Sequence, residues 1–125
     1  MVVNRILTNL CSSDLKASTK FYTSLFNFSV QFESDWFVHL VAENQNLEIG
    51  IILADHKLIP ESFRGSPAGL YITLVVEDCE AVCELAKEKG IEIVQEPQMT
   101  VYGQNRLLLK DPAGILVDVS SVPAG

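Results

Sequence analysis

Histidine, cysteine and basic residues are scarce in this sequence of 125 residues. It has two histidines and three cysteines, and its nine lysines and arginines stand against sixteen aspartates and glutamates, which gives a formal net charge of −7. Phosphate backbones and anionic lipids repel an acidic chain, so we expect neither a nucleic acid nor a membrane as a partner. The three cysteines lack paired zinc-type spacing, and an odd number of them favours free thiols in a reducing cytoplasm.

Long apolar runs and targeting segments are also missing. The longest apolar run, Ile49–Ala54, is far shorter than the roughly 20 residues that a membrane helix needs. No continuous apolar segment precedes a cleavage site near the N-terminus, so we expect no secretory signal and a cytoplasmic protein. The sequence has neither a Gly-rich phosphate loop nor a nucleophile elbow, which disfavours the enzyme classes that use them.

The chain has the composition of a globular protein, and two strands near its C-terminus stand out. Apolar residues make up 48% of the sequence, enough for the core of about one domain. The segment Asp111–Gly114 (Asp-Pro-Ala-Gly) has the residues of a tight turn and joins two apolar strands. Asp118 interrupts the second of these strands, and a carboxylate there either faces water or is used for function.

The first half reads as a strand, a helix and three strands. Ser12–Asp14 is a helix-start signal, an apolar stripe runs through Ala17, Phe21 and Leu25, and Asn27 suits the left-handed position that ends a helix. Alternation in the first strand places Leu7, Asn9 and Cys11 on one side. The expected elements are a strand over Val2–Cys11, a helix over Leu15–Leu25, and strands over Phe28–Phe32, Trp36–Ala42 and Leu47–Leu53.

The second half repeats this order after an irregular stretch. Residues 55–68 contain Pro60, Gly65 and Pro67, and they form either a linker or a loop over a pocket. Asp78 then begins a helix that Gly90 ends. The expected elements are a helix over Cys79–Lys89, with Val82, Cys83, Leu85 and Ala86 buried, and strands over Leu70–Val76, Ile91–Val94, Met99–Tyr102, Arg106–Lys110 and Ile115–Ser120. Each helix covers only one face of its mixed sheet, so the bare faces must pack together or enclose a cavity.

These motifs together resemble a known superfamily. The motifs are the helix starts at Asp14 and Asp78, Phe21-Tyr22 late in the first helix, and Lys89-Gly90 at the end of the second. A further motif runs from Tyr102-Gly103 through Arg106 to the turn Asp111–Gly114. At this spacing the chain is similar to the vicinal oxygen chelate superfamily, the group of glyoxalase I, the bleomycin resistance proteins and the extradiol dioxygenases. The resemblance covers residues 3–121. It implies an α+β domain of two βαβββ modules, 3–54 and 69–121, joined by 55–68 as a linker.

In that superfamily the two modules form curved mixed sheets around a cleft, often completed by a second chain. A homodimer is therefore implied. The metal-dependent members hold a divalent ion through a first-strand residue, usually His, and a later-strand residue of each module. Seven residues before each helix-start Asp stand Leu7 and Tyr71, while the later-strand positions fall on Glu48 and Asp118.

These four positions argue against a tight metal site and against a metal cofactor. Leu7 has no donor atom, and a neutral phenol at Tyr71 is a poor ligand. Two carboxylates with water hold Mg²⁺ or Ca²⁺ only weakly, and Zn²⁺ or Ni²⁺ sites usually include His or Cys. The only histidines are His39, in a strand, and His56, at the start of the irregular stretch.

The same positions suit a pocket for a small molecule that is aromatic or cationic. Unpaired carboxylates at Glu48 and Asp118 supply negative charge, and aromatic walls allow stacking and cation–π attraction. The candidate ligand-binding residues are Leu7, Trp36, His39, Glu48, Tyr71, Tyr102, Arg106 and Asp118, with Phe37 and Phe63 as further flat faces. No residue is assigned a catalytic role.

Each candidate also has a purely structural interpretation. Asp118 can form a salt bridge with Arg106 or Lys110, Tyr71 can pack in the core, and His39 can be a solvated strand residue. Two catalytic alternatives remain open: a thiol at Cys11 near a helix N-terminus, and a metal-free isomerase that uses Tyr71 with Asp118.

Three functions are therefore weighed. The leading one is a binding or sequestering protein without a tight metal site, as the resemblance to the bleomycin resistance proteins implies. The alternative is a metal-dependent lyase or isomerase of the glyoxalase I type. The third is a structural or regulatory module whose cavity stays empty.

Overall fold

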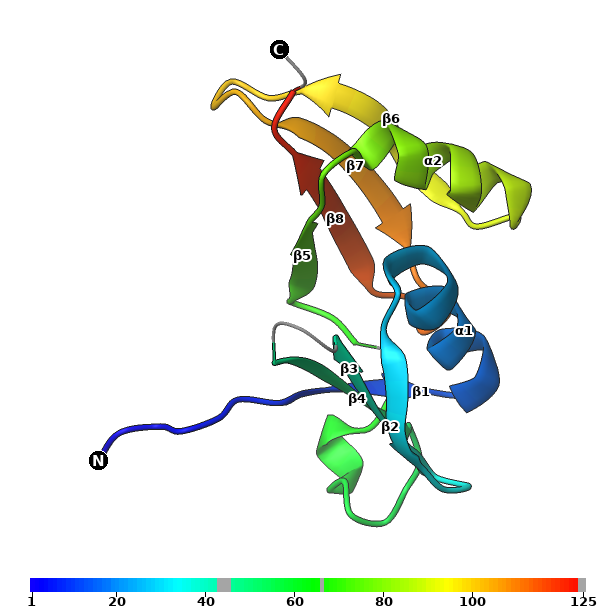
Figure 1. Cartoon of the computed structure of the whole chain (residues 1–125). Helices are drawn as coiled ribbons and strands as arrows, with labels where there is room; N and C mark the ends of the chain where they lie inside the picture. The colour runs from blue at the N-terminus through cyan, green and yellow to red at the C-terminus, as the bar shows by residue number, and fades with distance from the viewer. Residues whose placement is uncertain (43–45, 66, 124–125) are drawn as a thin grey trace. The chain divides into compact units, whose positions relative to one another are not determined.

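Each half of the chain forms a compact unit of its own (Figure 1). The computed structural model describes residues 1–42, 46–65 and 67–123, and the chain divides into unit 1, Met1–Pro67, and unit 2, Ala68–Gly125. Each unit has a four-stranded mixed sheet and one α-helix. The α+β class and the order strand, helix, three strands in each half are confirmed.

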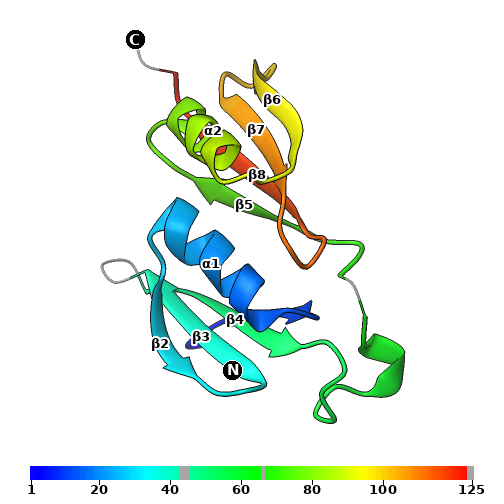
Figure 2. The ribbon, with the colours of Figure 1, turned by 90° about the vertical axis from the view of Figure 1, so that its right-hand side faces the viewer.

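Unit 1 has its helix on one face of the sheet only. It contains β1 (Thr8–Ser12), α1 (Leu15–Phe26), β2 (Ser29–Glu33), β3 (Phe37–Ala42), β4 (Leu47–Leu53) and the short 3₁₀ helix η1 (Glu61–Phe63). The strand order is β1-β4-β3-β2, in which β1 and β4 are parallel and the other neighbours antiparallel. α1 packs against β3 and β4 (Figure 2). The opposite face of this sheet carries the candidate site described below.

Unit 2 repeats the same topology. It contains β5 (Tyr71–Val75), α2 (Cys79–Glu88), β6 (Ile93–Met99), β7 (Asn105–Lys110) and β8 (Leu116–Ser121). The strand order is β5-β8-β7-β6, with β5 and β8 parallel, and α2 packs against β6, β7 and β8. None of the helices in the described residues is long and apolar enough to span a membrane.

The expected helix starts are confirmed by their capping geometry, whereas α1 ends one residue later than expected, at Phe26, and α2 one residue earlier, at Glu88. Asp14 accepts a hydrogen bond from the backbone N–H of Ala17 at 3.0 Å, and Asp78 accepts one from that of Glu80 at 3.0 Å. These bonds satisfy donors that the first turn of a helix leaves free. Asn27, the C-cap of α1, is left-handed with φ 57°, and Gly90, with φ 69°, follows α2.

The buried faces of both helices differ in part from the expected stripes. In α1, Phe21 and Leu25 are buried as expected, but Ser18 is buried in place of Ala17. Ser18 tolerates burial because its Oγ lies 2.7 Å from Ser12 Oγ, so both hydroxyl groups have a partner. In α2, Cys83 and Ala86 are buried as expected, Val82 and Leu85 stay half-buried, and Cys79 completes the buried set.

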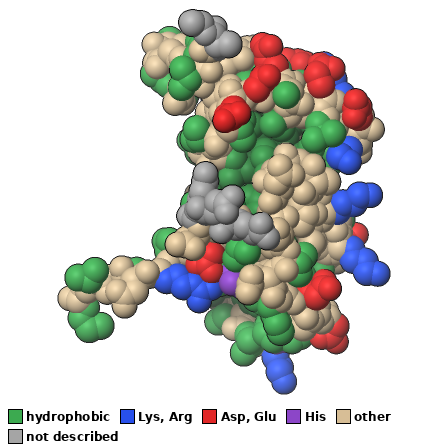
Figure 3. Space-filling model, in the orientation of Figure 1, with side chains coloured by type: hydrophobic (Ala, Val, Ile, Leu, Met, Phe, Trp, Pro, Cys, Tyr) green, Lys and Arg blue, Asp and Glu red, His purple; other side chains and the backbone are tan. Residues whose placement is uncertain are grey.

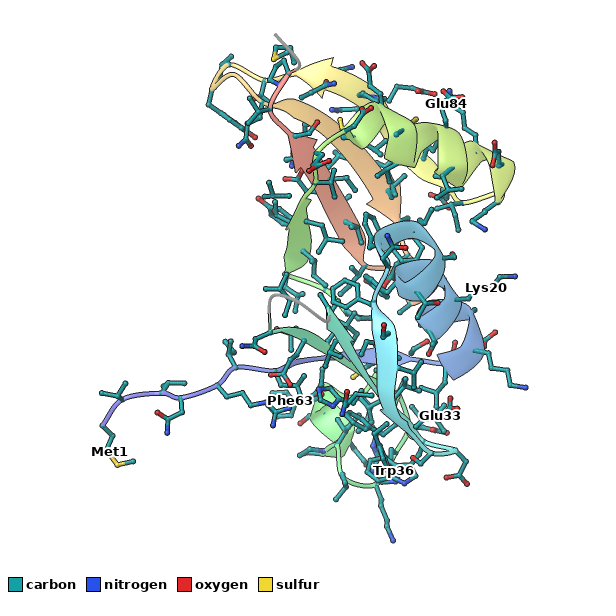
Figure 4. The ribbon with its side chains drawn as sticks, in the orientation of Figure 1. Met1, Lys20, Glu33, Trp36, Phe63 and Glu84 are labelled. Carbon is teal, nitrogen blue, oxygen red and sulfur yellow. The ribbon has the colours of Figure 1, made fainter. Side chains whose placement is uncertain are left out.

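The first strand begins later than expected. Val2–Cys11 was the expected range, but β1 starts at Thr8, which pairs with Ile49 of β4. Residues 1–7 therefore continue past the end of the sheet as an extended arm, which Figure 4 shows ending at Met1. We call residues 1–7 the N-terminal arm.

The expected strands Ile91–Val94 and Met99–Tyr102 are likewise replaced by a single strand, β6. This strand contains Pro97, but β6 is an edge strand, and its register with β7 shifts between Gln95 and Gln98. A proline is compatible with an edge strand at such an irregularity, because no ladder hydrogen bond needs its missing N–H.

Candidate functional site

Alternation along the strands of unit 1 separates two faces of its sheet. Leu10 is 2% exposed and Ile51 is 0% exposed, and both belong to the core beneath α1. Successive side chains of a strand point to opposite faces, so Asn9, His39 and Gly50 belong to the other face. The register places Gly50 between Asn9 on β1 and His39 on β3. We call this the open face of unit 1.

Glu48 on β4 is the central charged group of the open face. Arg5 of the N-terminal arm donates from Nε to Glu48 Oε2 at 2.7 Å and also from Nη2 to Glu48 Oε1. His39 Nε2 lies 2.8 Å from the same Oε1. Figure 3 shows acidic, basic and histidine side chains side by side where the arm leaves unit 1. Both oxygens of the carboxylate are thus engaged.

This arrangement keeps Glu48 ionised. The hydrogen bond from Arg5 is the largest cause that lowers the pKa of Glu48 to about 2, and the hydrogen bond with His39 adds to it. In return, the hydrogen bond to Glu48 raises the pKa of Arg5 above its ordinary value. Arg5 and Glu48 therefore form a fully charged pair at neutral pH.

A pocket lies beside this pair, within unit 1. Its volume is about 750 Å³, inside the range of about 300–1,000 Å³ that is usual for small-molecule sites. Its lining combines the Arg5–Glu48 pair with apolar and amide-bearing residues. The apolar ones are Val3, Ile6, Val41 and Ala42, and the amide-bearing ones are Asn4, Gln31 and Asn46. The pocket thus offers one strong ionic anchor and a wall that is polar and apolar in about equal parts.

Trp36 and His56, whose loops follow β2 and β4, meet face to face. Their ring centroids are 4.0 Å apart with an interplanar angle of 15°, and Phe37 lies against the indole with centroids 5.8 Å apart. Figure 4 shows Trp36 near the β2–β3 turn, and Phe63 on η1 is 76% exposed. Trp36 can therefore report on the 55–68 stretch by its fluorescence.

In unit 2, Asp118 is buried within a polar cluster on β5, β7 and β8. Its Oδ2 lies 3.1 Å from Arg106 Nε and accepts a hydrogen bond from Thr73 Oγ1 at 3.3 Å, while its Oδ1 accepts one from Ser120 Oγ at 2.8 Å. The contact with Asp118 raises the pKa of Arg106. The Nε–H of Arg106 is not aligned as a hydrogen-bond donor, so this contact is an ion pair. Tyr71 is 56% exposed on β5.

The structure brings the predicted site residues together in two groups. His39 and Glu48 meet in unit 1, whereas Arg106 and Asp118 meet in unit 2. The expectation of unpaired carboxylates is wrong, because an arginine neutralises each of them. For Asp118, the structure shows the salt bridge that was the purely structural interpretation, with Arg106 and not Lys110 as the partner.

Of the remaining predicted residues, Leu7 and Trp36 take no part in these two ion clusters, whereas Tyr71 and Tyr102 lie near enough to Arg106 to help raise its pKa. Leu7 is half-buried directly before β1, and Trp36 pairs with His56. Tyr102 is 64% exposed in the turn between β6 and β7. That all these residues line one cleft remains a prediction.

Sequence reasoning missed the roles of Arg5, Asn9 and His56. Arg5 stands 43 positions from Glu48, in a segment expected to be a strand, and no local pattern marks such a contact. For Asn9, the alternation of the first strand was the available signal, because it places Asn9 on the same side as the candidate Leu7.

The donors present do not fit the divalent metal that the resemblance implies. Leu7 offers no donor atom, and Glu48 already binds Arg5 and His39. Asp118 is held by Arg106, Thr73 and Ser120. Across residues 1–42, 46–65 and 67–123, no group of three or more His, Cys, Asp or Glu side chains could hold a metal ion.

Comparisons with known proteins agree with this fold. The family model described as "Glyoxalase/Bleomycin resistance protein/Dioxygenase superfamily" matches residues 3–119. No curated protein sequence matches the chain.

Similar solved structures share the fold at low identity. A hypothetical protein from S. aureus has a TM-score of 0.80 at 22% identity, covering 97% of this chain and 95% of that one. A superfamily member from Sphaerobacter thermophilus has a TM-score of 0.77 at 20% identity, with 96% and 98% covered. A bleomycin resistance determinant encoded on the transposon Tn5 has a TM-score of 0.67 at 20% identity, with 98% and 100% covered.

Proposed function

The chain belongs to the Glyoxalase/Bleomycin resistance protein/Dioxygenase superfamily, and on this premise we propose that it binds or sequesters a small molecule without a tight metal site. Members of one fold carry out different chemistry, so the proposal depends on the side chains that this chain presents. Its ligand is an aromatic or cationic small molecule.

The observation that carries the proposal is the pocket of about 750 Å³ beside Glu48. A ligand-binding pocket typically pairs apolar walls with a few polar groups that fix orientation. Val41 and Ala42 supply such a wall, and the carboxylate of Glu48 supplies the orienting group. The bleomycin resistance determinant among the similar structures supports the same type of function.

A metal-dependent lyase or isomerase of the glyoxalase I type is the competing function. Its chemistry needs donors that can replace water around a divalent ion, and a leucine at position 7 cannot do so. A carboxylate that is already held by a guanidinium and an imidazole is a weak competitor for a metal. The side chains present therefore favour binding over metal-assisted catalysis.

Ligand binding can be tested by the melting temperature of the protein, because Trp36, the only tryptophan, does not line the pocket. A panel of cationic, neutral and anionic aromatic compounds should include some that raise the melting temperature. A panel in which no compound does so would support the third function, a module with an empty cavity.

The metal-dependent alternative needs its own measurement. Protein purified without a chelator should contain no stoichiometric transition metal by mass spectrometry. It should also show no turnover of a glutathione hemithioacetal when Ni²⁺ or Zn²⁺ is added. Tightly bound metal together with metal-stimulated turnover would replace the proposal with the glyoxalase I type of function.

We further propose a cytoplasmic homodimer. All three cysteines, Cys11, Cys79 and Cys83, are free thiols, which suits a reducing compartment. The cleft of this superfamily is often completed by a second chain, and light scattering after size-exclusion chromatography should give twice the 13.8 kDa mass of the chain. A monomeric mass over the micromolar range would contradict the dimer.

A further inference from the structure

The contact between Arg5 and Glu48 has the geometry of a ligand held in a site. The guanidinium approaches side-on, with Nε on one carboxylate oxygen and Nη2 on the other. Two parallel N–H···O bonds of this kind recognise a planar fork, and a single ammonium group cannot reproduce them. The site therefore selects a shape as well as a charge.

His39 prepares Glu48 for this partner. Its Nε2 lies 2.8 Å from Glu48 Oε1 and 3.4 Å from Arg5 Nη2, so it lies beside both members of the pair. The Glu48 side chain is 13% exposed and that of His39 16% exposed, whereas that of Arg5 is 59% exposed. The acceptor thus belongs to the sheet, while the donor comes from outside it.

The N-terminal arm that carries Arg5 is held weakly. Val3 is 80% exposed and Ile6 81% exposed. Residues 1–7 are in no strand, and their backbone makes no turn or loop hydrogen bond with the described part of the chain. The side chain of Arg5 is itself 59% exposed, so water can compete for its guanidinium. Another molecule with the same fork can therefore take the place of Arg5.

We propose that Glu48 and His39 form a binding site for small molecules that carry a guanidinium or amidinium group, and that Arg5 of the N-terminal arm is its internal occupant. This deepens the proposed function and rests on it, because Glu48 lines the same pocket; the ligand replaces the part of the lining that the arm supplies, Val3 to Ile6. The ligand's planar cation occupies the position of the Arg5 guanidinium, and its remaining part lies along Val41 and Ala42 of β3. Binding then requires release of the arm.

Competition with a tethered group sets the expected size of the effect. Arg5 is three residues from β1, and a short flexible tether gives an effective concentration in the millimolar range. Removing its guanidinium should therefore strengthen the binding of a free guanidinium compound by one plus the ratio of this concentration to the dissociation constant, which is about tenfold when that constant is about a tenth of the effective concentration.

The test is chemical rescue: methylguanidinium is titrated into Arg5→Ala. Its binding is measured by the change in the NMR signals of His39 and of the Glu48 carboxylate. We expect saturable binding to Arg5→Ala, binding to wild type that is weaker by the factor that the effective concentration of Arg5 sets, and weaker binding of methylammonium to Arg5→Ala. Equal affinity in wild type and Arg5→Ala, or equal affinity for the two cations, would overturn the inference.

Two matched variants separate this site from general charge effects. Lys20→Ala removes one positive charge from the exposed side of α1 and should bind methylguanidinium as wild type does. Arg5→Ala combined with Glu48→Gln keeps the shape of the acceptor but removes its charge, and it should not bind. Retained binding in this double variant would place the site elsewhere and overturn the inference.

The same proteins distinguish this inference from the proposed function. If neutral or anionic compounds of the panel bind wild type and Arg5→Ala, but methylguanidinium binds both equally weakly, only the guanidinium site is wrong. If no compound of any class binds either protein, the proposed function fails as well.

Discussion

The amide oxygen of Asn9 lies where a side-chain carbon at Gly50 would be. A Cβ added to Gly50 would overlap Asn9 Oδ1 and come within 3.0 Å of the Phe37 ring. Gly50 is therefore required for the close approach of the Asn9 amide to the β4 backbone rather than for an unusual backbone angle. The glycine shapes the floor of the open face next to His39.

Replacing Gly50 with alanine should force the Asn9 amide out of its place. We expect Gly50→Ala to lower the free energy of unfolding by about 1 kcal/mol, the lower end of the usual cost of overpacking, because the end of the Asn9 side chain can move. Urea unfolding measures this change. The double variant with Asn9→Ala should recover part of the loss, and an equal loss in both would show that Asn9 is not the obstacle.

The low pKa of Glu48 predicts a pH window for stability. Because this pKa is lowered from 4.5 to about 2 in the folded protein, its contribution is fully present above about pH 4.5 and is lost as the pH falls toward 2. Glu48→Gln removes that titration. The difference in unfolding free energy between wild type and this variant should therefore shrink between pH 4.5 and pH 2 in urea titrations. A constant difference across this window would mean that Arg5 does not hold Glu48 in solution.

Local sequence signals were enough to predict most of the fold. The caps at Asp14 and Asp78 bond to backbone groups within three residues, so the residue type and its neighbours already specify them. The turn at Asp111 is equally local, because its Oδ1 accepts from the backbone N–H of Ala113 and of Ile115. Such signals need no knowledge of the rest of the chain.

Local signals could not predict the contacts between segments that are distant in the sequence. The apolar alternation of residues 2–11 is typical of a strand, and only the pairing with β4, whose first pair is Thr8 with Ile49, shows where β1 begins. The sequence marked Glu48 and His39 as candidates, but not Arg5 as the residue that joins them. Charge pairs across a sheet depend on register and on the path of the arm, and neither can be read from neighbouring residues.

The three thiols should differ sharply in reactivity. Cys79 is 0% exposed and Cys83 2% exposed, while Cys11 is half-buried on β1. Burial is the main cause that raises the pKa of Cys83, and its hydrogen bond with Glu96 adds to it. Since the thiolate is the reactive form, Cys83 should resist alkylation.

Iodoacetamide should therefore modify native protein at Cys11 first, and mass spectrometry of the digested protein can locate the label. Cys11→Ser should stay unlabelled until it is unfolded in urea, after which both α2 cysteines should react. Early labelling of Cys83 in this variant would mean that α2 opens readily from the sheet of unit 2.

Asp118 presents the opposite case to Glu48, because its partner lies within the sheet. Its side chain is 7% exposed and that of Arg106 26% exposed. Hydrogen bonds from Thr73 and Ser120 satisfy part of the carboxylate, but they do not neutralise its charge. Removing Arg106 therefore leaves a buried charge without compensation.

Arg106→Met should lower the free energy of unfolding by roughly 2 kcal/mol, less than for a fully buried pair because Arg106 is partly exposed. Lys110→Met is the matched control, since it removes the same charge from an exposed position on β7 and should change stability by no more than about 0.5 kcal/mol. Combining Arg106→Met with Asp118→Asn should recover part of the loss, because the amide carries no charge. Urea unfolding of the four proteins measures this coupling, and equal losses for Arg106→Met and Lys110→Met would show that Asp118 needs no cationic partner.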